Sequence, residues 1–139
     1  MRTLLAAMIL VAVSPSFGAG LSQAGALYQL SSDYATCAAY YTVGETCLRN
    51  QSIRADYLEA QHKATILGYE AGAAAGVSVE GLYFESETAM ESMKAMMKSD
   101  CDNIAVVVER YAESCQALMT DPQKRLRELS AKRTMTRRE

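Results

Sequence analysis

Four cysteines are the residues whose type and spacing constrain the chemistry of this chain most: Cys37, Cys47, Cys101 and Cys115. Their intervals contain no C-x-x-C, which excludes a thioredoxin-like redox pair and c-type haem attachment and disfavours a zinc site. An even number of cysteines in a short chain predicts disulfides, provided that the chain enters an oxidising compartment. We therefore expect all four to be paired in two bridges.

Methionine and histidine supply the other soft metal ligands. Met90, Met93, Met96 and Met97 fall within eight positions, and the chain has one histidine, His62. Thioethers select Cu(I), so Met93, Met97 and His62 form the alternative hypothesis, a copper-binding site. Met90, Met93 and Met97 also share one apolar helical stripe, where Met fills irregular gaps in a core. We favour core filling and expect neither a metal site nor a cofactor.

Catalytic motifs are absent from the sequence, which contains no G-x-S-x-G, no H-E-x-x-H and no Gly-rich phosphate loop. Asp100 and Asp102 do not begin a calcium loop of the EF-hand kind. The Gly and Glu that such a loop requires are replaced by Ala105 and Tyr111. With a single histidine available for acid-base work, we expect no enzymatic activity and no catalytic residues.

The N-terminus has the pattern of a secretory signal peptide. Arg2 is followed by ten apolar residues at 4–13 and by a breaker with small residues at 14–18. This pattern predicts a signal peptide over residues 1–18, with cleavage after Gly18. We therefore expect a periplasmic or secreted protein. No apolar run reaches the roughly 18 residues that a membrane-spanning helix needs, so no transmembrane segment is expected.

The chain of 139 residues is 50% hydrophobic, and its formal net charge is only -2. These values exclude a wholly disordered chain and fit one domain. Apolar residues at steps of three and four predict a helix over residues 21–49. A second helix follows an N-cap at Ser52 and ends in the small-residue stretch 72–76. A third, without Gly or Pro, extends over residues 82–120.

Short linkers between these helices predict an all-α, up-down-up three-helix bundle over residues 19–121, braced by disulfides. The first and third helices are then parallel. A disulfide requires Cα atoms within about 7 Å, so both bridges must join these two helices. Parallel helices favour the pairs Cys37–Cys101 and Cys47–Cys115.

An antiparallel arrangement would instead give Cys37–Cys115 and Cys47–Cys101. This alternative resembles the twin C-x9-C helical hairpins of the mitochondrial intermembrane space. The resemblance covers the interval of nine residues between Cys37 and Cys47, whereas thirteen separate Cys101 and Cys115. No function is carried over from that family.

Small residues recur every fourth position in the second helix, at Ala64, Gly68, Gly72 and Gly76. Such a stripe lets another helix approach closely. We favour packing inside the bundle over a dimer seam, and a homodimer remains the alternative.

Charge is divided unevenly along the chain. Residues 20–121 carry a net charge of -8, whereas residues 122–139, which begin at a Pro suited to the first turn of a helix, carry +5. We expect this basic C-terminal helix or tail to contact a protein, an anionic surface (lipid or cell-wall polymer) or the chain's own acidic body, rather than nucleic acid. The sequence thus favours an exported binding or structural module. Its partner-binding residues are Lys124, Arg125, Arg127, Lys132, Arg133, Arg137 and Arg138.

Overall fold

The computed structural model describes the backbone of residues 17–136 and the side chains of residues 23–131. The all-α class is confirmed, since this part of the chain contains five α-helices, a short 3-10 helix and no strand. Most of the predicted signal peptide, residues 1–16, lies outside the described residues. The helices are α1 (Phe17–Cys47), α2 (Gln51–Ala75), α3 (Val79–Met96), η1 (Cys101–Asn103), α4 (Ala105–Thr120) and α5 (Pro122–Thr136).

The short connections on either side of α2 are fixed by caps. Asn50, and not Ser52 as predicted, caps the N-terminus of α2, because its side-chain oxygen accepts from the backbone N–H groups of Ser52 and Ile53. Gly76 ends α2 with a φ of 77°, a left-handed conformation suited to glycine. Ser78 then caps α3, which begins at Val79, three residues earlier than the sequence predicts.

The core lies along α1, where Leu30, Tyr34 and Ala38 are buried. The small residues of α2 pack against this core. A Cβ atom on Gly68 would lie 3.2 Å from the Cβ of Tyr34, and one on Gly72 would lie 2.5 Å from the side chain of Leu82 in α3. The small-residue stripe therefore permits close packing of α2 against α1 and α3 within the chain.

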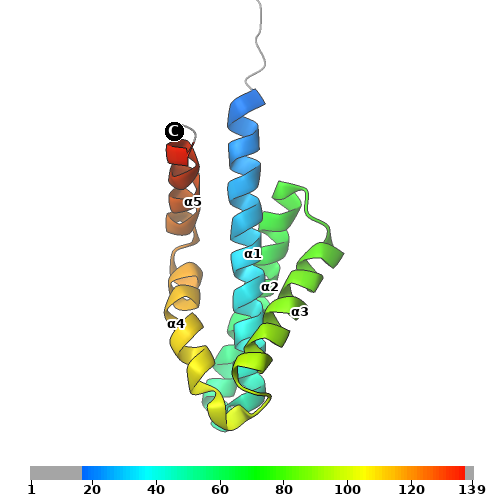
Figure 1. The fold of residues 1–139 in the computed structure, drawn as a ribbon, viewed down its shortest axis with the longest axis vertical. Helices are drawn as coiled ribbons and strands as arrows, with labels where there is room; N and C mark the ends of the chain where they lie inside the picture. The colour runs from blue at the N-terminus through cyan, green and yellow to red at the C-terminus, as the bar shows by residue number, and fades with distance from the viewer. Residues whose placement is uncertain (1–16, 137–139) are drawn as a thin grey trace, which may run out of the picture.

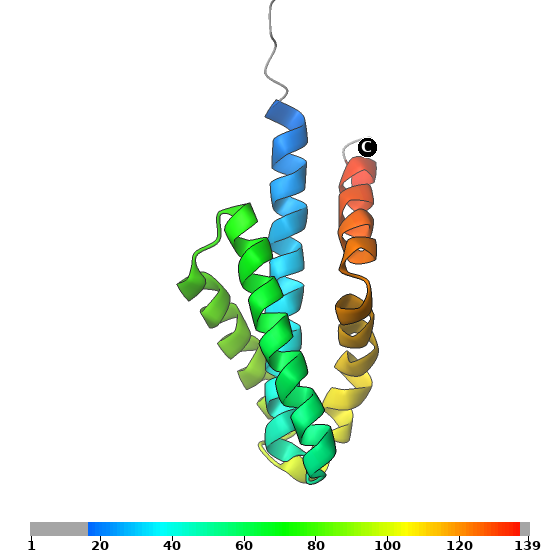
Figure 2. The same ribbon diagram turned by 180° about the vertical axis from the view of Figure 1, so that it is seen from behind.

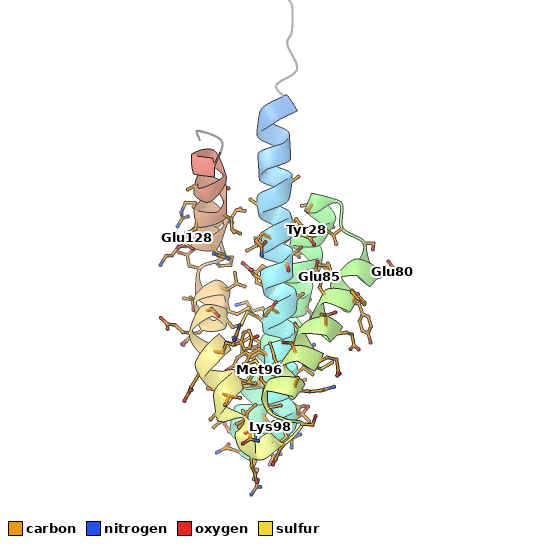
Figure 3. The ribbon with its side chains drawn as sticks, in the orientation of Figure 1. Tyr28, Glu80, Glu85, Met96, Lys98 and Glu128 are labelled. Carbon is orange, nitrogen blue, oxygen red and sulfur yellow. A yellow bond between two sulfur atoms is a disulfide. The ribbon has the colours of Figure 1, made fainter. Side chains whose placement is uncertain are left out.

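The predicted third helix is in fact two helices, α3 and α4. Between them Lys98 and Ser99 adopt positive φ values of 53° and 57°, which non-glycine residues seldom adopt. Asp100 caps η1 through the backbone N–H of Asp102, and the side chain of Asn103 donates to the Met97 carbonyl at 3.0 Å. The chain reverses here, and Lys98 lies at the tip of the molecule (Figure 3).

This reversal makes the predicted disulfide pairing wrong. α3 runs in the same direction as α1, but α4 runs in the opposite direction (Figure 1). The bridges are therefore Cys37–Cys115, with Cα atoms 5.4 Å apart, and Cys47–Cys101, with Cα atoms 5.1 Å apart. Cys101 meets the end of α1 at the reversal, and Cys115 meets α1 farther up.

The helices flank α1 on two sides. α2 and α3 lie on one side, and α4 and α5 lie on the other, in both views (Figures 1 and 2). Tyr28 of α1 and Glu85 of α3 join the first side through a hydrogen bond of 2.9 Å (Figure 3). On the second side the basic segment forms α5, and its Leu129 is buried. Among the described helices, none has the length and hydropathy needed to cross a membrane.

Candidate functional site

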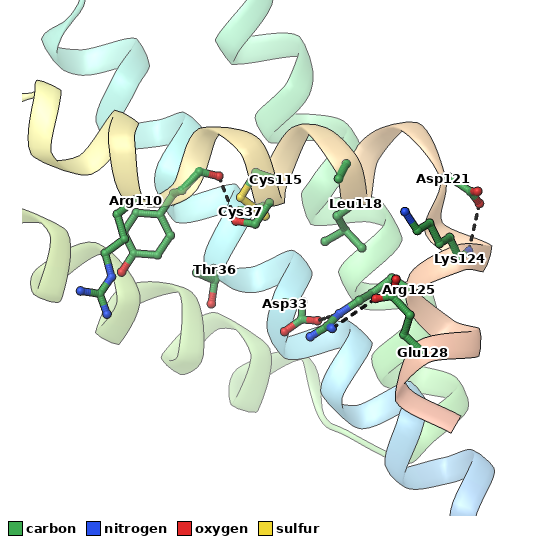
Figure 4. A pocket seen from close by; sticks show the side chains of 13 residues that line it. Asp33, Thr36, Cys37, Arg110, Cys115, Leu118, Asp121, Lys124, Arg125 and Glu128 are labelled. Carbon is green, nitrogen blue, oxygen red and sulfur yellow. Dashed lines mark hydrogen bonds and ion pairs between the residues drawn. A yellow bond between two sulfur atoms is a disulfide. The ribbon is translucent and has the colours of Figure 1, made fainter. Parts of the chain in front are cut away.

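A cavity of about 420 Å³ lies between α1 and the two helices α4 and α5 (Figure 4). Its volume falls within the range of about 300–1,000 Å³ that is usual for ligand sites. α1 contributes Asp33, Thr36 and Cys37. Residues of α4, α5 and the turn between them supply the rest of the lining: Arg110, Tyr111, Ser114, Cys115, Ala117, Leu118, Asp121, Lys124, Arg125 and Glu128.

The floor of this cavity is apolar and covalently fixed. The Cys37–Cys115 disulfide joins α1 to α4 there, and both sulfur-bearing residues are buried. Leu118, one turn farther along α4, is also buried and lines the same cavity. The bridge therefore sets the distance between the two walls of the site.

One wall is closed by an ion pair between helices far apart in sequence. Arg125 Nε donates to Asp33 Oδ2 at 2.7 Å, and the guanidinium also lies 3.7 Å from Glu128. The hydrogen bond to Asp33 raises the pKa of Arg125 above its ordinary value. Arg125, one of the predicted partner-binding residues, thus contacts the chain's own acidic body.

The remaining acidic group of the cavity, Asp121, is paired with Arg127 at 3.8 Å. The three carboxylates that line the cavity are therefore shared between Arg125 and Arg127. Arg110 and Lys124, in contrast, are exposed cations with no acidic partner among the described side chains. Figure 4 places them at opposite ends of the cavity, on either side of the apolar floor.

Arg110 is positioned by an aromatic neighbour. Its guanidinium carbon lies 5.8 Å from the centroid of the Tyr111 ring, within the range of a cation-π contact. This contact holds the guanidinium against the Tyr111 ring at one end of the cavity without neutralising its charge.

The other predicted residues of the basic segment are only partly described. Lys132 and Arg133 belong to α5, but their side chains lie outside the described residues, as do Arg137 and Arg138 entirely. Their role in partner binding stays a prediction.

The residues of the alternative copper site differ in exposure. Met93 and Met97 are buried in the core, at 0% and 3% exposure, whereas His62 is exposed on α2. Met97 lines a cavity with Cys47 and Cys101, and His62 does not line it. Over the described residues, no group of three or more His, Cys, Asp or Glu side chains is arranged to hold a metal ion.

Sequence reasoning missed Asp33, Arg110 and Tyr111 as parts of this site. Asp33 is 92 residues from Arg125, and only the reversal after α3 brings the two together. The polar run that begins at Lys98 is the one signal that could have located this reversal.

Comparisons with known proteins give no match: no protein-family model, no curated protein and no solved structure matches this chain. Its function therefore has to be argued from the geometry of the site.

Proposed function

We propose that this chain is an exported, non-enzymatic binding module that holds acidic groups of its partner at the two ends of the cavity between α1 and α4–α5. The observation that carries the proposal is the pair of exposed cations, Arg110 and Lys124, at the two ends of an apolar floor. A partner with acidic groups that flank a small apolar part would complement both features.

The electrostatics of the cavity support an anionic rather than a cationic ligand. Its carboxylates, those of Asp33, Asp121 and Glu128, already have cationic partners in the chain. Arg110 and Lys124 are the charges left for a ligand. Hydrogen bonds to charged groups contribute more than neutral ones, about 1.5–3 kcal/mol each where solvent is excluded, and less at exposed positions.

Export is supported by the cysteines and by the N-terminal pattern. The two disulfides suggest an oxidising, extracytoplasmic environment, where such bridges persist. The apolar stretch at residues 4–13 after Arg2 fits delivery to that environment by a signal peptide. A non-enzymatic role is favoured because the single histidine, His62, lies on α2 away from this cavity.

The test is capture of partners from the exported fraction by mature protein, with mass identification, in three matched forms. These are the wild type, Arg110→Glu with Lys124→Glu, and a control of equal net charge, Arg49→Glu with Lys63→Glu. We expect the wild type and the control to capture the same partner and the cavity variant to lose it.

Vesicles of anionic phosphatidylglycerol and purified cell-wall polymer form the second arm, at low salt and above about 0.15 M, where the Debye length is near 8 Å. Binding lost equally in the control variant would show that net charge alone is responsible. Capture unaffected by the cavity substitutions would contradict the proposed site.

A further inference from the structure

A second cavity, of about 300 Å³, lies among α1, α2 and α3, on the side of α1 away from the first. Its lining includes small residues of α1 and α2, among them Ala35, Ala38, Ala64 and Gly68. Their short side chains leave the space unfilled. The volume is at the small end of the range for ligand sites, about 300–1,000 Å³, and suits a ligand of few heavy atoms.

Two tyrosines and one carboxylate line this cavity: Tyr69 of α2, and Tyr83 and Glu87 of α3. Tyr69 and Tyr83 are 37% and 60% exposed, so a ligand in solution can reach both rings. The two rings do not stack on one another, and no hydrogen bond from a described residue reaches either phenol or the Glu87 carboxylate. These groups are therefore available to a ligand.

The charge of the lining has one sign. Glu87 is the only charged residue among those that line the cavity, and all of them are described. Lys94, about two helical turns beyond it, donates to Glu91 at 2.8 Å and interacts with Glu87 only through its charge, at longer range. The hydroxyls of Thr42 and Thr65 donate to backbone carbonyls of their own helices, so they offer no donor to an anion.

We infer that this cavity binds a small quaternary ammonium group, held by the faces of Tyr69 and Tyr83 and by the carboxylate of Glu87. Aromatic faces attract cations, and the apolar part of the lining, among it Ala35, Ala38 and Ala64, suits the methyl groups of a quaternary ammonium. Its methyl groups would contact the small residues and Met90. This inference concerns a different site and does not depend on the anionic partner proposed above.

Calorimetric titration of the mature, oxidised protein with choline tests the inference, alongside 3,3-dimethylbutanol, the neutral molecule of the same shape. We expect saturable binding of choline and none of the alcohol. Tyr83→Leu and Glu87→Gln should each weaken choline binding, by roughly 2- to 10-fold, the range expected for one cation-π or carboxylate contact.

Phe84→Leu is the matched control, because Phe84 is a neighbouring ring, 72% exposed, that does not line the cavity. Thermal melting of each variant checks that the fold is retained. Absence of saturable choline binding, equal binding of the alcohol, or equal weakening by Phe84→Leu would each overturn the inference.

Phosphatidylcholine vesicles distinguish the two sources of such a group. Co-sedimentation that is competed by free choline would assign the site to a lipid headgroup. Choline binding without co-sedimentation would assign it to a free solute.

Discussion

The two sides of α1 are held by different means. On one side α2 and α3 contact α1 extensively, with Ala64, Gly68 and Gly72 allowing the backbones to approach closely. On the other side α4 and α5 contact α1 less. The Cys37–Cys115 disulfide joins α4 to α1, the Cys47–Cys101 disulfide joins η1 to α1, and the Asp33–Arg125 ion pair joins α5 to α1. One side therefore depends on packing, and the other combines a smaller apolar contact, through Val107, Leu118 and Leu129, with cross-links.

This difference explains where the two cavities come from. Small side chains in α2 leave space beneath Tyr69 and Tyr83, although the helices are close. Between α1 and α4, in contrast, the Cys37–Cys115 bridge fixes the separation of the two helices beside the cavity. A disulfide can hold two helices at a fixed separation beside a cavity, without side chains that fill the space between them.

Removal of the Cys37–Cys115 disulfide should have the largest effect on the stability of the protein. We expect Cys37→Ala with Cys115→Ala to lower the free energy of unfolding by about 3–4 kcal/mol, since the bridge closes a loop that the Cys47–Cys101 bridge has already shortened. Urea unfolding followed by circular dichroism measures the loss. Removal of Cys47–Cys101, with a separation of 54, should cost slightly less.

Peptide mapping of the unreduced protein checks the connectivity behind that prediction. We expect linked peptides that contain Cys37 with Cys115 and Cys47 with Cys101. A peptide that links Cys37 to Cys101 would contradict the reversal between α3 and α4.

Overpacking between α1 and α2 should have the next largest effect on stability. A Cβ atom on buried Gly44 would overlap the Tyr57 ring, so Gly44→Ala should destabilise the protein by about 1–3 kcal/mol in thermal unfolding. Gly81→Ala is the control, since its Cβ would meet neighbours at an ordinary 3.4 Å and should stabilise α3 by about 0.5–1 kcal/mol. Equal effects of the two substitutions would show that α1 and α2 are not closely packed at Gly44.

High pH should weaken the packed side through Tyr40. Burial, and then a 2.6 Å hydrogen bond with Tyr57, raise the pKa of Tyr40 above its ordinary value of 10.0. The unfolded chain therefore loses the Tyr40 proton first. Its contribution to stability is complete below pH 10 and is lost as the pH rises toward the folded pKa.

Urea unfolding at a series of pH values from about 9 to 11 measures this loss. One such group removes at most about 1.4 kcal/mol per pH unit. Tyr40→Phe should make the decline less steep, at the cost of about 1 kcal/mol for the lost hydrogen bond at neutral pH. An unchanged slope in this variant would contradict the assignment to Tyr40.

The ion pair of the cross-linked side should have a smaller effect. Arg125→Gln should lower stability by about 1 kcal/mol or less, because the side chains of Arg125 and Asp33 are still 32% and 23% exposed. Arg49→Gln is the control, since Arg49 and Asp102 are almost fully exposed, and should change the melting temperature very little. A larger loss for Arg49→Gln would show that the pair with Asp33 does not hold α5.

The sequence predicted the packed side better than the cross-linked side. Periodic apolar residues located the first two helices, because one face of each is buried along its length. The break after Met97 was missed because no Gly or Pro marks it. Lys98 and Ser99 adopt glycine-like conformations there, and local caps and the Cys47–Cys101 bridge accompany the reversal.

The candidate site was predictable only in part, for the same reason. A basic C-terminal helix that contacts the acidic body was among the expected outcomes. Arg125 makes such a contact through its ion pair with Asp33. No local pattern, however, relates Asp33 to α5 or Arg110 to Lys124. Their arrangement follows from the direction of α4, which depends on the residues at the reversal, among them Lys98, Ser99, Asp100 and Asn103.

Hydrogen exchange with mass spectrometry, on the protein before and after reduction of both disulfides, tests most directly whether packing holds one side of α1 and cross-links hold the other. We expect reduction to remove protection from α4 and α5 while the amides of α1 and α2 remain protected, because their contacts do not require the bridges. Loss of protection in all five helices together, or unchanged protection of α4 and α5, would contradict this account.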